Sequence, residues 1–225
     1  RGLLGLHAPL IEVEVHVSQG LPSLTIVGLA EAAVRESKDR VRSAIINSGF
    51  QFPTKRLTIN LAPADLPKDG SRLDLPIALG ILMASGQIPE HATDQLEFIG
   101  ELALDGQLRP ITGILSIAIA CQQSGHQLIL PEQNAPEASQ LPQFEVFAAQ
   151  HLKDVCEHLS KQQPIAQYQP QTTTTVDQYK FDLADVKGQL RPRRALEIAA
   201  AGGHSLLFKG PPGTGKTLLA SRLAS

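Results

Sequence analysis

The sequence predicts an α+β fold for residues 1–160, then a linker, then the beginning of an α/β phosphate-loop domain. Three observations carry this prediction. Strand-like and helix-like segments mix irregularly up to residue 160, residues 161–178 are polar and proline-bearing, and GPPGTGKT occupies residues 210–217. Because strands and helices do not follow strict βαβ alternation, the first domain is α+β. We therefore predict domains at 1–160 and 179–225, with a linker at 161–178.

Hydrophobic periodicity predicts the elements of the first half of this domain. Residues 11–28 alternate apolar and polar side chains on both sides of SQGLP, which predicts a β-hairpin. Residues 31–49 place four apolar side chains at helical spacing before Gly49: Val34, Val41, Ala44 and Ile45. Residues 56–63 then predict a strand, and residues 73–86 a buried helix with Pro76 in its first turn.

The second half of the domain continues with alternating element types. Residues 96–111 predict a hairpin that turns at Asp105-Gly106. An apolar helix, a strand and an amphipathic helix are expected at 114–125, 127–131 and 151–161. After the linker, a helix over 192–201 ends at Gly202-Gly203, and SLLFKG (205–210) predicts a strand that leads into GPPGTGKT.

The stretch GPPGTGKT matches the phosphate-loop pattern GxxxxGK[ST], with an apolar segment before it and the helix-like TLLASRLA after it. Its glycines let backbone N–H groups face a phosphate, and the next helix presents its positive end to the same anion. In this motif the lysine neutralises the β- and γ-phosphates and the threonine hydroxyl ligates Mg²⁺. We therefore expect ATP and Mg²⁺ as ligands, and the alternative is a glycine-proline turn without a ligand. The expected ATP-binding residues are Gly210, Pro211, Pro212, Gly213, Thr214, Gly215, Lys216 and Thr217, with Thr217 the Mg²⁺ residue.

Composition is that of an ordinary soluble globular protein, with 42% hydrophobic and 19% charged residues. No apolar run approaches the roughly 20 residues of a membrane span, so we expect a cytoplasmic protein. The two cysteines, Cys121 and Cys156, match no metal spacing and are interpreted as small core residues. Charge is uneven: residues 35–72 carry eight basic and four acidic side chains, whereas residues 73–160 carry two and eleven. A phosphate-bearing partner would be drawn to the first of these segments and repelled by the second.

Six segments together resemble one family. They are EVEVHVSQGLPSLTIVGL, RVRSAIINSGF, INLAPADLPKDGSRLDLPIALGIL, IGELALDGQLRPI, DVKGQ and ALEIAAAGGHSLLFKGPPGTGKT. They are similar to the ComM/YifB family, the magnesium-chelatase-like AAA+ ATPases of bacteria, over nearly the whole chain. The resemblance implies a Lon-protease-like (ribosomal S5 domain 2-like) first domain and an AAA+ module that assembles into a hexameric ring. It also implies an ATP-driven helicase and branch-migration motor, acting on branched or single-stranded DNA during natural transformation.

The resemblance also carries individual residues. The DVKGQ box implies adenine contacts at Val186 and Gly188, and the alternative is a simple turn before a helix. Aligned with Lon-like sequences, Asp74 stands where the nucleophilic serine belongs and Leu115 where the lysine base belongs, so we expect no protease activity. The remaining AAA+ elements would follow Ser225. We therefore expect no catalytic residue within these 225 residues and no ATP turnover by this piece alone.

A basic stripe raises the question of DNA contact. Arg35, Lys38 and Arg42 fall at i, i+3 and i+7, opposite the apolar face of their helix. Four further basic residues would widen the patch: Lys55, Arg56, Lys68 and Arg72. Such a cluster binds phosphates without sequence preference. The alternatives are a solvated helix face with weak ion pairs such as Glu31–Arg35, or a head-to-tail contact between subunits that closes a ring.

Two features stay open at this stage. His204 precedes the predicted strand and is either structural or close to the nucleotide, and residues 191–194 (RPRR) either contact phosphate or a neighbour or form a solvated helix start. The function predicted overall is the ATP-dependent DNA motor, and the alternative is a metal-chelatase-like or chaperone-like AAA+ remodeller of protein. The phosphate loop does not discriminate between these two, because the same ATPase drives both.

Overall fold

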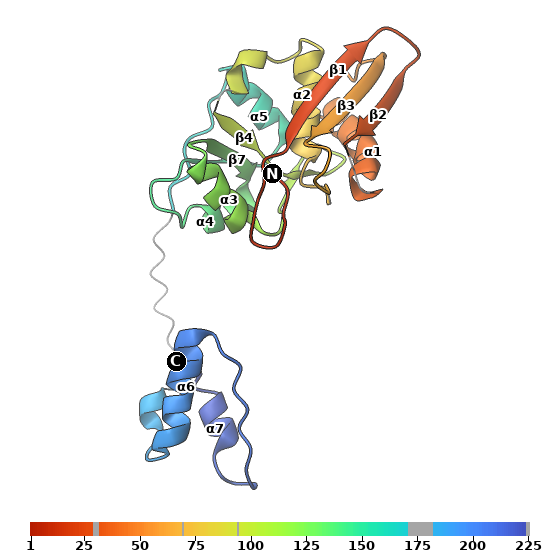
Figure 1. Ribbon diagram of the computed structural model, residues 1–225. Helices are drawn as coiled ribbons and strands as arrows, with labels where there is room; N and C mark the ends of the chain where they lie inside the picture. The colour runs from red at the N-terminus through yellow and green to blue at the C-terminus, as the bar shows by residue number, and fades with distance from the viewer. Residues whose placement is uncertain (29–31, 69, 94, 171–181, 224–225) are drawn as a thin grey trace. The chain divides into compact units, whose positions relative to one another are not determined.

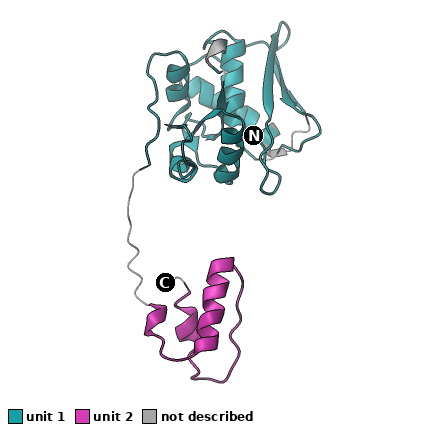
Figure 2. Ribbon diagram, turned by 60° about the vertical axis from the view of Figure 1, so that its left-hand side comes forward, with its two compact units in different colours: residues 1–171 teal, residues 172–225 magenta. Residues whose placement is uncertain are grey.

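The computed structural model describes residues 1–28, 32–68, 70–93, 95–170 and 182–223. The chain divides into two compact units, residues 1–171 and residues 172–225 (Figure 1, Figure 2). Ile165 and Tyr168, which fall in the predicted linker, pack against the cores of the first unit.

The first unit begins with a three-stranded sheet in the order β1-β3-β2 (Figure 1). Its strands are β1 (Glu12–Ser18), β2 (Ser23–Val27) and β3 (Arg56–Ala62). The predicted 11–28 hairpin is wrong, because β3 lies between the two strands, antiparallel to β1 and parallel to β2. The alternation of apolar and polar residues correctly predicts two strands. It indicates which side chains share a face of the sheet, but it does not indicate which strand is the partner.

Two helices pack against this sheet: α1 (Ala32–Asn47) and α2 (Asp74–Ala84). The predicted apolar face of α1 is confirmed, since Val34, Val41, Ala44 and Ile45 have no exposed surface. Leu57, Ile59 and Leu61 face them from alternate positions of β3. The helix α2 is buried on most of its surface, which explains why its sequence is almost wholly apolar.

A second, wholly parallel sheet in the order β4-β7-β8 forms the rest of the first unit. Its strands are β4 (Leu96–Phe98), β7 (Gln127–Pro131) and β8 (Val146–Ala149). The central strand β7 is buried on both faces. Leu128 and Leu130 join one cluster with α3 (Ile114–Gln123) and α4 (Ala135–Ala138), whereas Ile129 joins another with α5 (Leu152–Leu159). Burial on both faces produces the continuous apolar run of this strand.

The predicted 96–111 hairpin is correct only in its second half. A short hairpin joins β5 (Glu101–Leu102) to β6 (Leu108–Arg109), whereas residues 96–98 pair with β7 instead. Short 3₁₀ turns at Glu90–Thr93 (η1) and Glu132–Asn134 (η2) complete the unit. Cys121 and Cys156 are buried as expected, and burial raises the pKa of each thiol to about 12.

The second unit contains η3 (Leu183–Asp185), α6 (Leu190–Gly202) and α7 (Lys216–Ala220). A small core of Val186, Leu196 and Leu219 holds them together. The strand predicted for 205–210 is not formed: these residues are extended coil, with Leu207 87% exposed. A strand needs a neighbour to hydrogen-bond with, and the described residues of this unit contain no other strand. Among all described residues, no helix is long and apolar enough to cross a membrane.

Candidate functional site

The phosphate-loop segment wraps around its own lysine. The Nζ atom of Lys216 donates hydrogen bonds to the carbonyl oxygens of Gly210 at 3.0 Å and Pro211 at 2.8 Å. The Thr214 hydroxyl donates to the same Pro211 carbonyl at 3.0 Å, which closes the loop from the other side. These hydrogen bonds close residues 210–216 into a turn around the Lys216 ammonium group.

Two glycines make this turn possible. Gly213 and Gly215 have φ angles of 81° and 78°, in the left-handed region where a side chain is strained. Gly215 is also the N-cap residue of α7, so the helix follows directly from the loop. These glycines, the lysine and Thr217 at the start of α7 fit a nucleotide phosphate group with Mg²⁺. Lys216 would hold the phosphates, and the exposed Thr217 hydroxyl would reach the metal.

The DVKGQ segment lies beside this loop in the second unit. Val186 is only 2% exposed, because its side chain packs in the small core with Leu196 and Leu219. Its carbonyl accepts a hydrogen bond from the Arg193 guanidinium at 3.1 Å. Gly188 is exposed and has a φ of 74°, which favours glycine at this turn. The Val186 side chain is thus a core group, and only its backbone and that of Gly188 are left to face a base.

Sequence reasoning missed Gln189 in this segment. Its side-chain Nε2 donates to the backbone carbonyl of Thr214 at 3.3 Å, so it contacts the phosphate loop directly. No local pattern reveals this contact, because its two ends are 25 residues apart.

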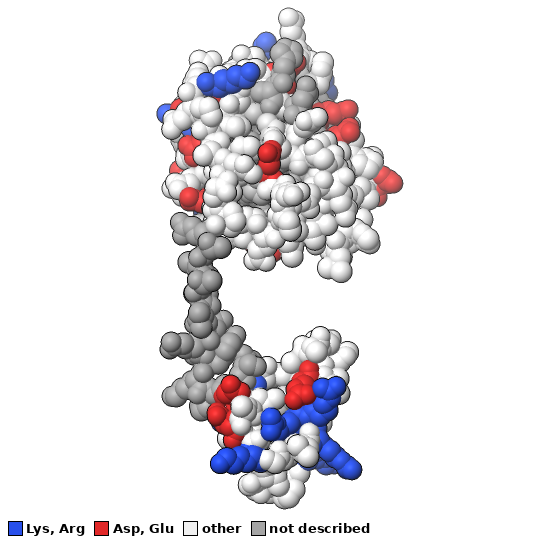
Figure 3. Space-filling model, turned by 90° about the vertical axis from the view of Figure 1, so that its left-hand side faces the viewer, with Lys and Arg blue, Asp and Glu red and all other residues white. Residues whose placement is uncertain are grey.

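His204 and the RPRR stretch have mainly local contacts. A side chain added at Gly202 would collide with the His204 ring, at 2.4 Å from Nε2, so the ring lies against the end of α6. In the RPRR stretch, Arg194 pairs with Glu197 at 2.9 Å and Arg191 is exposed, while Arg193 binds the Val186 carbonyl. In Figure 3, Lys and Arg side chains gather on the visible face of the second unit, whereas the visible face of the first unit is mostly uncharged.

The two positions that align with the Lon-type serine and lysine have other surroundings. Asp74 is 1% exposed at the start of α2, where its carboxylate pairs with Arg40 at 2.9 Å and accepts the Leu102 N–H at 3.3 Å. Burial raises the pKa of Asp74, and the Arg40 guanidinium opposes that shift. Leu115 is 37% exposed on α3 and offers no base. The nearby Ser71 hydroxyl donates to the Glu101 carboxylate, and Ser116 is half-buried.

The predicted basic patch is smaller in the structure than in the sequence. Lys68 has no exposed surface and donates to the Pro63 carbonyl, and Arg72 is 9% exposed, so the prediction that both would widen the patch is wrong. Their loop folds inward between β3 and α2, which charge spacing alone does not reveal. The side chain of Arg35 and the residue Glu31 lie outside the described residues.

Four of the predicted basic residues remain accessible. Lys38 is half-buried on α1, while Arg42, Lys55 and Arg56 are exposed. The Arg42 guanidinium stacks over the Phe52 ring at 5.2 Å, which holds this charge beside the loop that carries Lys55.

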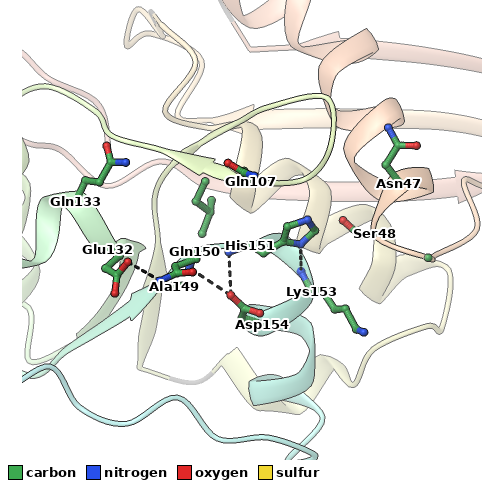
Figure 4. Close-up of a pocket in the computed structure, with 12 residues that line it drawn as sticks. Asn47, Ser48, Gln107, Glu132, Gln133, Ala149, Gln150, His151, Lys153 and Asp154 are labelled. Atoms are coloured by element: carbon green, nitrogen blue, oxygen red, sulfur yellow. Dashed lines mark hydrogen bonds between the residues drawn. The ribbon is translucent and has the colours of Figure 1, made fainter.

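A cavity of about 690 Å³ opens elsewhere in the first unit, at the carboxyl ends of β7 and β8 (Figure 4). Its wall is held by the start of α5. Asp154 accepts the backbone N–H groups of Gln150 and His151 at 3.3 and 2.9 Å, and the His151 ring accepts the Lys153 N–H at 3.1 Å. Gln150 also donates its side chain to Glu132 at 2.6 Å. The lining includes the carboxamides of Asn47, Gln107 and Gln133, and Lys153 is the one lysine or arginine among the described residues that form it, so the cavity is polar without a concentration of positive charge.

The fold and loop together define a two-unit protein in which a mixed α/β domain precedes a phosphate-loop segment. Residues 13–134 match the family described as subunit ChlI of Mg-chelatase, and residues 182–225 match magnesium chelatase, subunit ChlI. The chain therefore belongs to the magnesium-chelatase ChlI-like family, in its ComM/YifB group.

Relatives at the level of whole sequences agree with this assignment. The chain is 51% identical to a YifB protein of Salmonella typhimurium over 228 residues, which covers 100% of this chain and 44% of the relative. It is 50% identical to the competence protein ComM of Haemophilus influenzae over 99% of this chain and 45% of that protein. A Lon protease of Chloroflexus aurantiacus is 31% identical over 59% of this chain and 17% of its own length. The chain thus spans under half the length of its ComM and YifB relatives.

Proposed function

We propose that this chain is part of an ATP-dependent DNA motor that works in the integration of DNA during natural transformation. The observation that carries the proposal is the loop closed around Lys216, in which two glycines have left-handed backbone conformations. The 50% identity to a competence protein supports it. Helicase and branch-migration activity would belong to the whole protein, assembled as a hexameric ring.

Each residue of the loop would have its own role in binding ATP and Mg²⁺. Lys216 would bind the β- and γ-phosphates, and the backbone N–H groups of residues 213–216 would orient them. Thr217 would hold Mg²⁺, and the backbone at Val186 and Gly188 would lie against the base. Bound ATP supplies the phosphoanhydride bond whose hydrolysis drives the motor. The described residues of the second unit contain no acidic strand end to orient water, so hydrolysis would depend on the rest of the AAA+ module.

The accessible basic residues Lys38, Arg42, Lys55 and Arg56 support a DNA contact in the first unit. Arg35 belongs to the same proposal by its place on the helix. Each of these cations would neutralise a backbone phosphate without reading a base. The acidic segment 73–160 would instead face the basic segment of a neighbouring subunit, in a head-to-tail contact that closes a ring.

We also propose that the first domain is not a protease. Asp74 is committed to Arg40, and Leu115 carries no base, so neither half of a serine–lysine pair is available at these positions. A serine-reactive phosphonate probe should leave Ser71 unlabelled in the intact protein. Labelling at Ser71 that denaturation abolishes would overturn this proposal.

The function is tested by unwinding of a fork and of a four-way junction, using the polypeptide at the full length of its relatives. Unwinding should require ATP and disappear in Lys216→Ala, whereas Lys209→Ala, a nearby exposed lysine outside the motif, should retain it. The ChlI match favours a second candidate, a metal-chelatase-like or chaperone-like remodeller of protein. ATP hydrolysis without unwinding of either substrate would support that candidate and contradict the DNA motor.

A further inference from the structure

Gln189 occupies a backbone conformation that does not suit it. Its φ and ψ are 50° and 44°, in the left-handed region where glutamine is strained and glycine or asparagine is preferred. It stands at the N-cap position of α6, yet its side chain makes no capping hydrogen bond to that helix. Neither the turn nor the cap therefore explains a glutamine here.

The side chain instead crosses to the phosphate loop. Nε2 donates to the Thr214 carbonyl at 3.3 Å, and it would lie 3.1 Å from a Cβ added at Gly215. The contact thus depends on the length of glutamine, and a Cβ at Gly215 would crowd it. The Gln189 carbonyl meanwhile accepts the Arg193 N–H at 3.0 Å, which ties the residue to the first turn of α6.

The peptide unit between Thr214 and Gly215 links this contact to the Gly215 N–H, which would face a bound phosphate. In a trans peptide the C=O and the following N–H point in opposite directions. A donor that holds the Thr214 carbonyl therefore also fixes the direction of the Gly215 N–H. Glycine rotates freely, so without such a restraint this peptide unit can flip and turn its N–H away.

We propose that Gln189 is a positioning residue for the phosphate loop: its carboxamide holds the Thr214–Gly215 peptide so that the Gly215 N–H faces the bound phosphate. The inference rests on the proposed nucleotide site and adds a specific link between the DVKGQ segment and the loop. Through this link, the segment expected beside the base and the loop expected around the phosphates are held in one arrangement.

Two variants separate the contact from the backbone conformation. Gln189→Asn keeps the carboxamide and suits the left-handed region better, but it is one methylene too short to reach Thr214. Gln189→Glu keeps the length but replaces the donor with a carboxylate, which repels the carbonyl. Both should bind the fluorescent nucleotide mant-ADP with Mg²⁺ about fivefold to tenfold more weakly than the parent, the loss expected for one hydrogen bond. The measurement uses the polypeptide at the relatives' full length.

A second readout follows the loop without nucleotide. Hydrogen exchange at the Gly215 amide should accelerate in both variants, while the midpoint of thermal unfolding stays the same or rises in Gln189→Asn. Gln95→Asn provides the matched control, because Gln95 has a φ of 64° and lies in the first unit. It should leave both nucleotide affinity and Gly215 exchange unchanged.

The outcomes are distinguishable. If Gln189→Asn keeps the parent's mant-ADP affinity and Gly215 hydrogen exchange, only the backbone turn matters and the inference is overturned. This holds even if Lys216→Ala abolishes nucleotide binding. Parent-like mant-ADP affinity in Lys216→Ala would overturn the nucleotide site itself, and the role of Gln189 with it. Loss in Gln189→Asn, Gln189→Glu and Lys216→Ala, with Gln95→Asn unaffected, is the expected result.

Discussion

Asp74 is a residue of the first unit with a structural role. It lies at the start of α2. Here its carboxylate is 1% exposed and bound by Arg40 and the Leu102 amide. The ion pair ties α1 to the beginning of α2, so the aspartate stabilises the packing of two helices.

Removing the partner of this buried carboxylate should be costly. Arg40→Met leaves Asp74 buried without its counter-ion, and we expect a loss of about 3 kcal/mol in the free energy of unfolding. Lys38→Met on the same helix is the control and should change it by less than about 0.5 kcal/mol, because Lys38 has no buried partner among the contacts of the described residues. Urea unfolding followed by circular dichroism measures both. Equal effects of the two substitutions would contradict a stabilising role for the pair.

Glu97 should make stability depend on pH. Burial raises the pKa of its carboxyl, but Arg1, at 2.7 Å, and His126, at 2.9 Å, more than offset this and hold it below the ordinary value of 4.5. A depressed folded pKa contributes stability that is present above pH 4.5 and is lost as pH falls through the folded value.

We therefore expect Glu97→Gln to destabilise by about 3 kcal/mol at pH 7 and by progressively less as pH falls below about 4.5. Denaturant unfolding of the parent and the variant at pH 7, 5 and 3.5 measures the difference. Glu132→Gln, an exposed carboxylate, is the matched control. If the loss of stability in Glu97→Gln does not change with pH, the ion pair of Glu97 with Arg1 is not its source.

Among the elements, the contact between α2 and β1 shows why a helix interior contains glycine. A Cβ added at Gly80 would lie 2.7 Å from the Val15 Cγ2 atom and 3.9 Å from the Val13 Cγ1 atom. No side chain fits at that separation without movement of the helix or the strand. Gly80 therefore sets how closely α2 approaches the sheet.

Gly80→Ala should thus destabilise the first unit by about 1–2 kcal/mol, because overpacking outweighs the gain of about 1 kcal/mol in helix propensity. Val15→Ala removes the colliding methyl groups. In the double variant Val15→Ala/Gly80→Ala, the alanine at position 80 should cost nothing relative to Val15→Ala alone. A double-mutant cycle of unfolding free energies measures this coupling, and additive effects would mean that the two side chains do not collide.

The elements also show what sequence alone could predict. The faces of α1 and β3 were predictable because burial follows periodicity, as Val34 and Leu57 confirm. The partner of β2 was not, since strand pairing depends on α1 carrying the chain across to β3. The motif of the phosphate loop was equally readable, but the contact of Gln189 with Thr214 depends on a turn conformation that no spacing encodes. The burial of Lys68 and Arg72 was hidden for the same reason.

At the scale of the whole molecule, the distribution of charge determines which surfaces could bind a partner that carries phosphates. The acidic segment 73–160 supplies most of the lining of the polar cavity beside His151, where phosphate groups would be repelled. Exposed cations of the first unit include Arg42 on α1 and Lys55 and Arg56 at the start of β3, and the second unit carries its own basic residues around α6. Among the proposed DNA-contacting residues, Arg42, Lys55 and Arg56 are exposed.

We therefore expect the affinity for a labelled single-stranded oligonucleotide to fall steeply with salt. Each of Arg42→Ala, Lys55→Ala and Arg56→Ala should weaken binding and reduce the slope of log affinity against log salt by about 1, because one phosphate contact and its released counterion are lost. Fluorescence anisotropy between about 50 and 200 mM NaCl, with the polypeptide at its relatives' full length, gives that slope. Lys153→Ala removes an exposed cation from the acidic segment and should leave it unchanged. If all four variants keep the parent slope, the cations of α1 and β3 do not touch DNA, and the solvated face or the contact between subunits accounts for them.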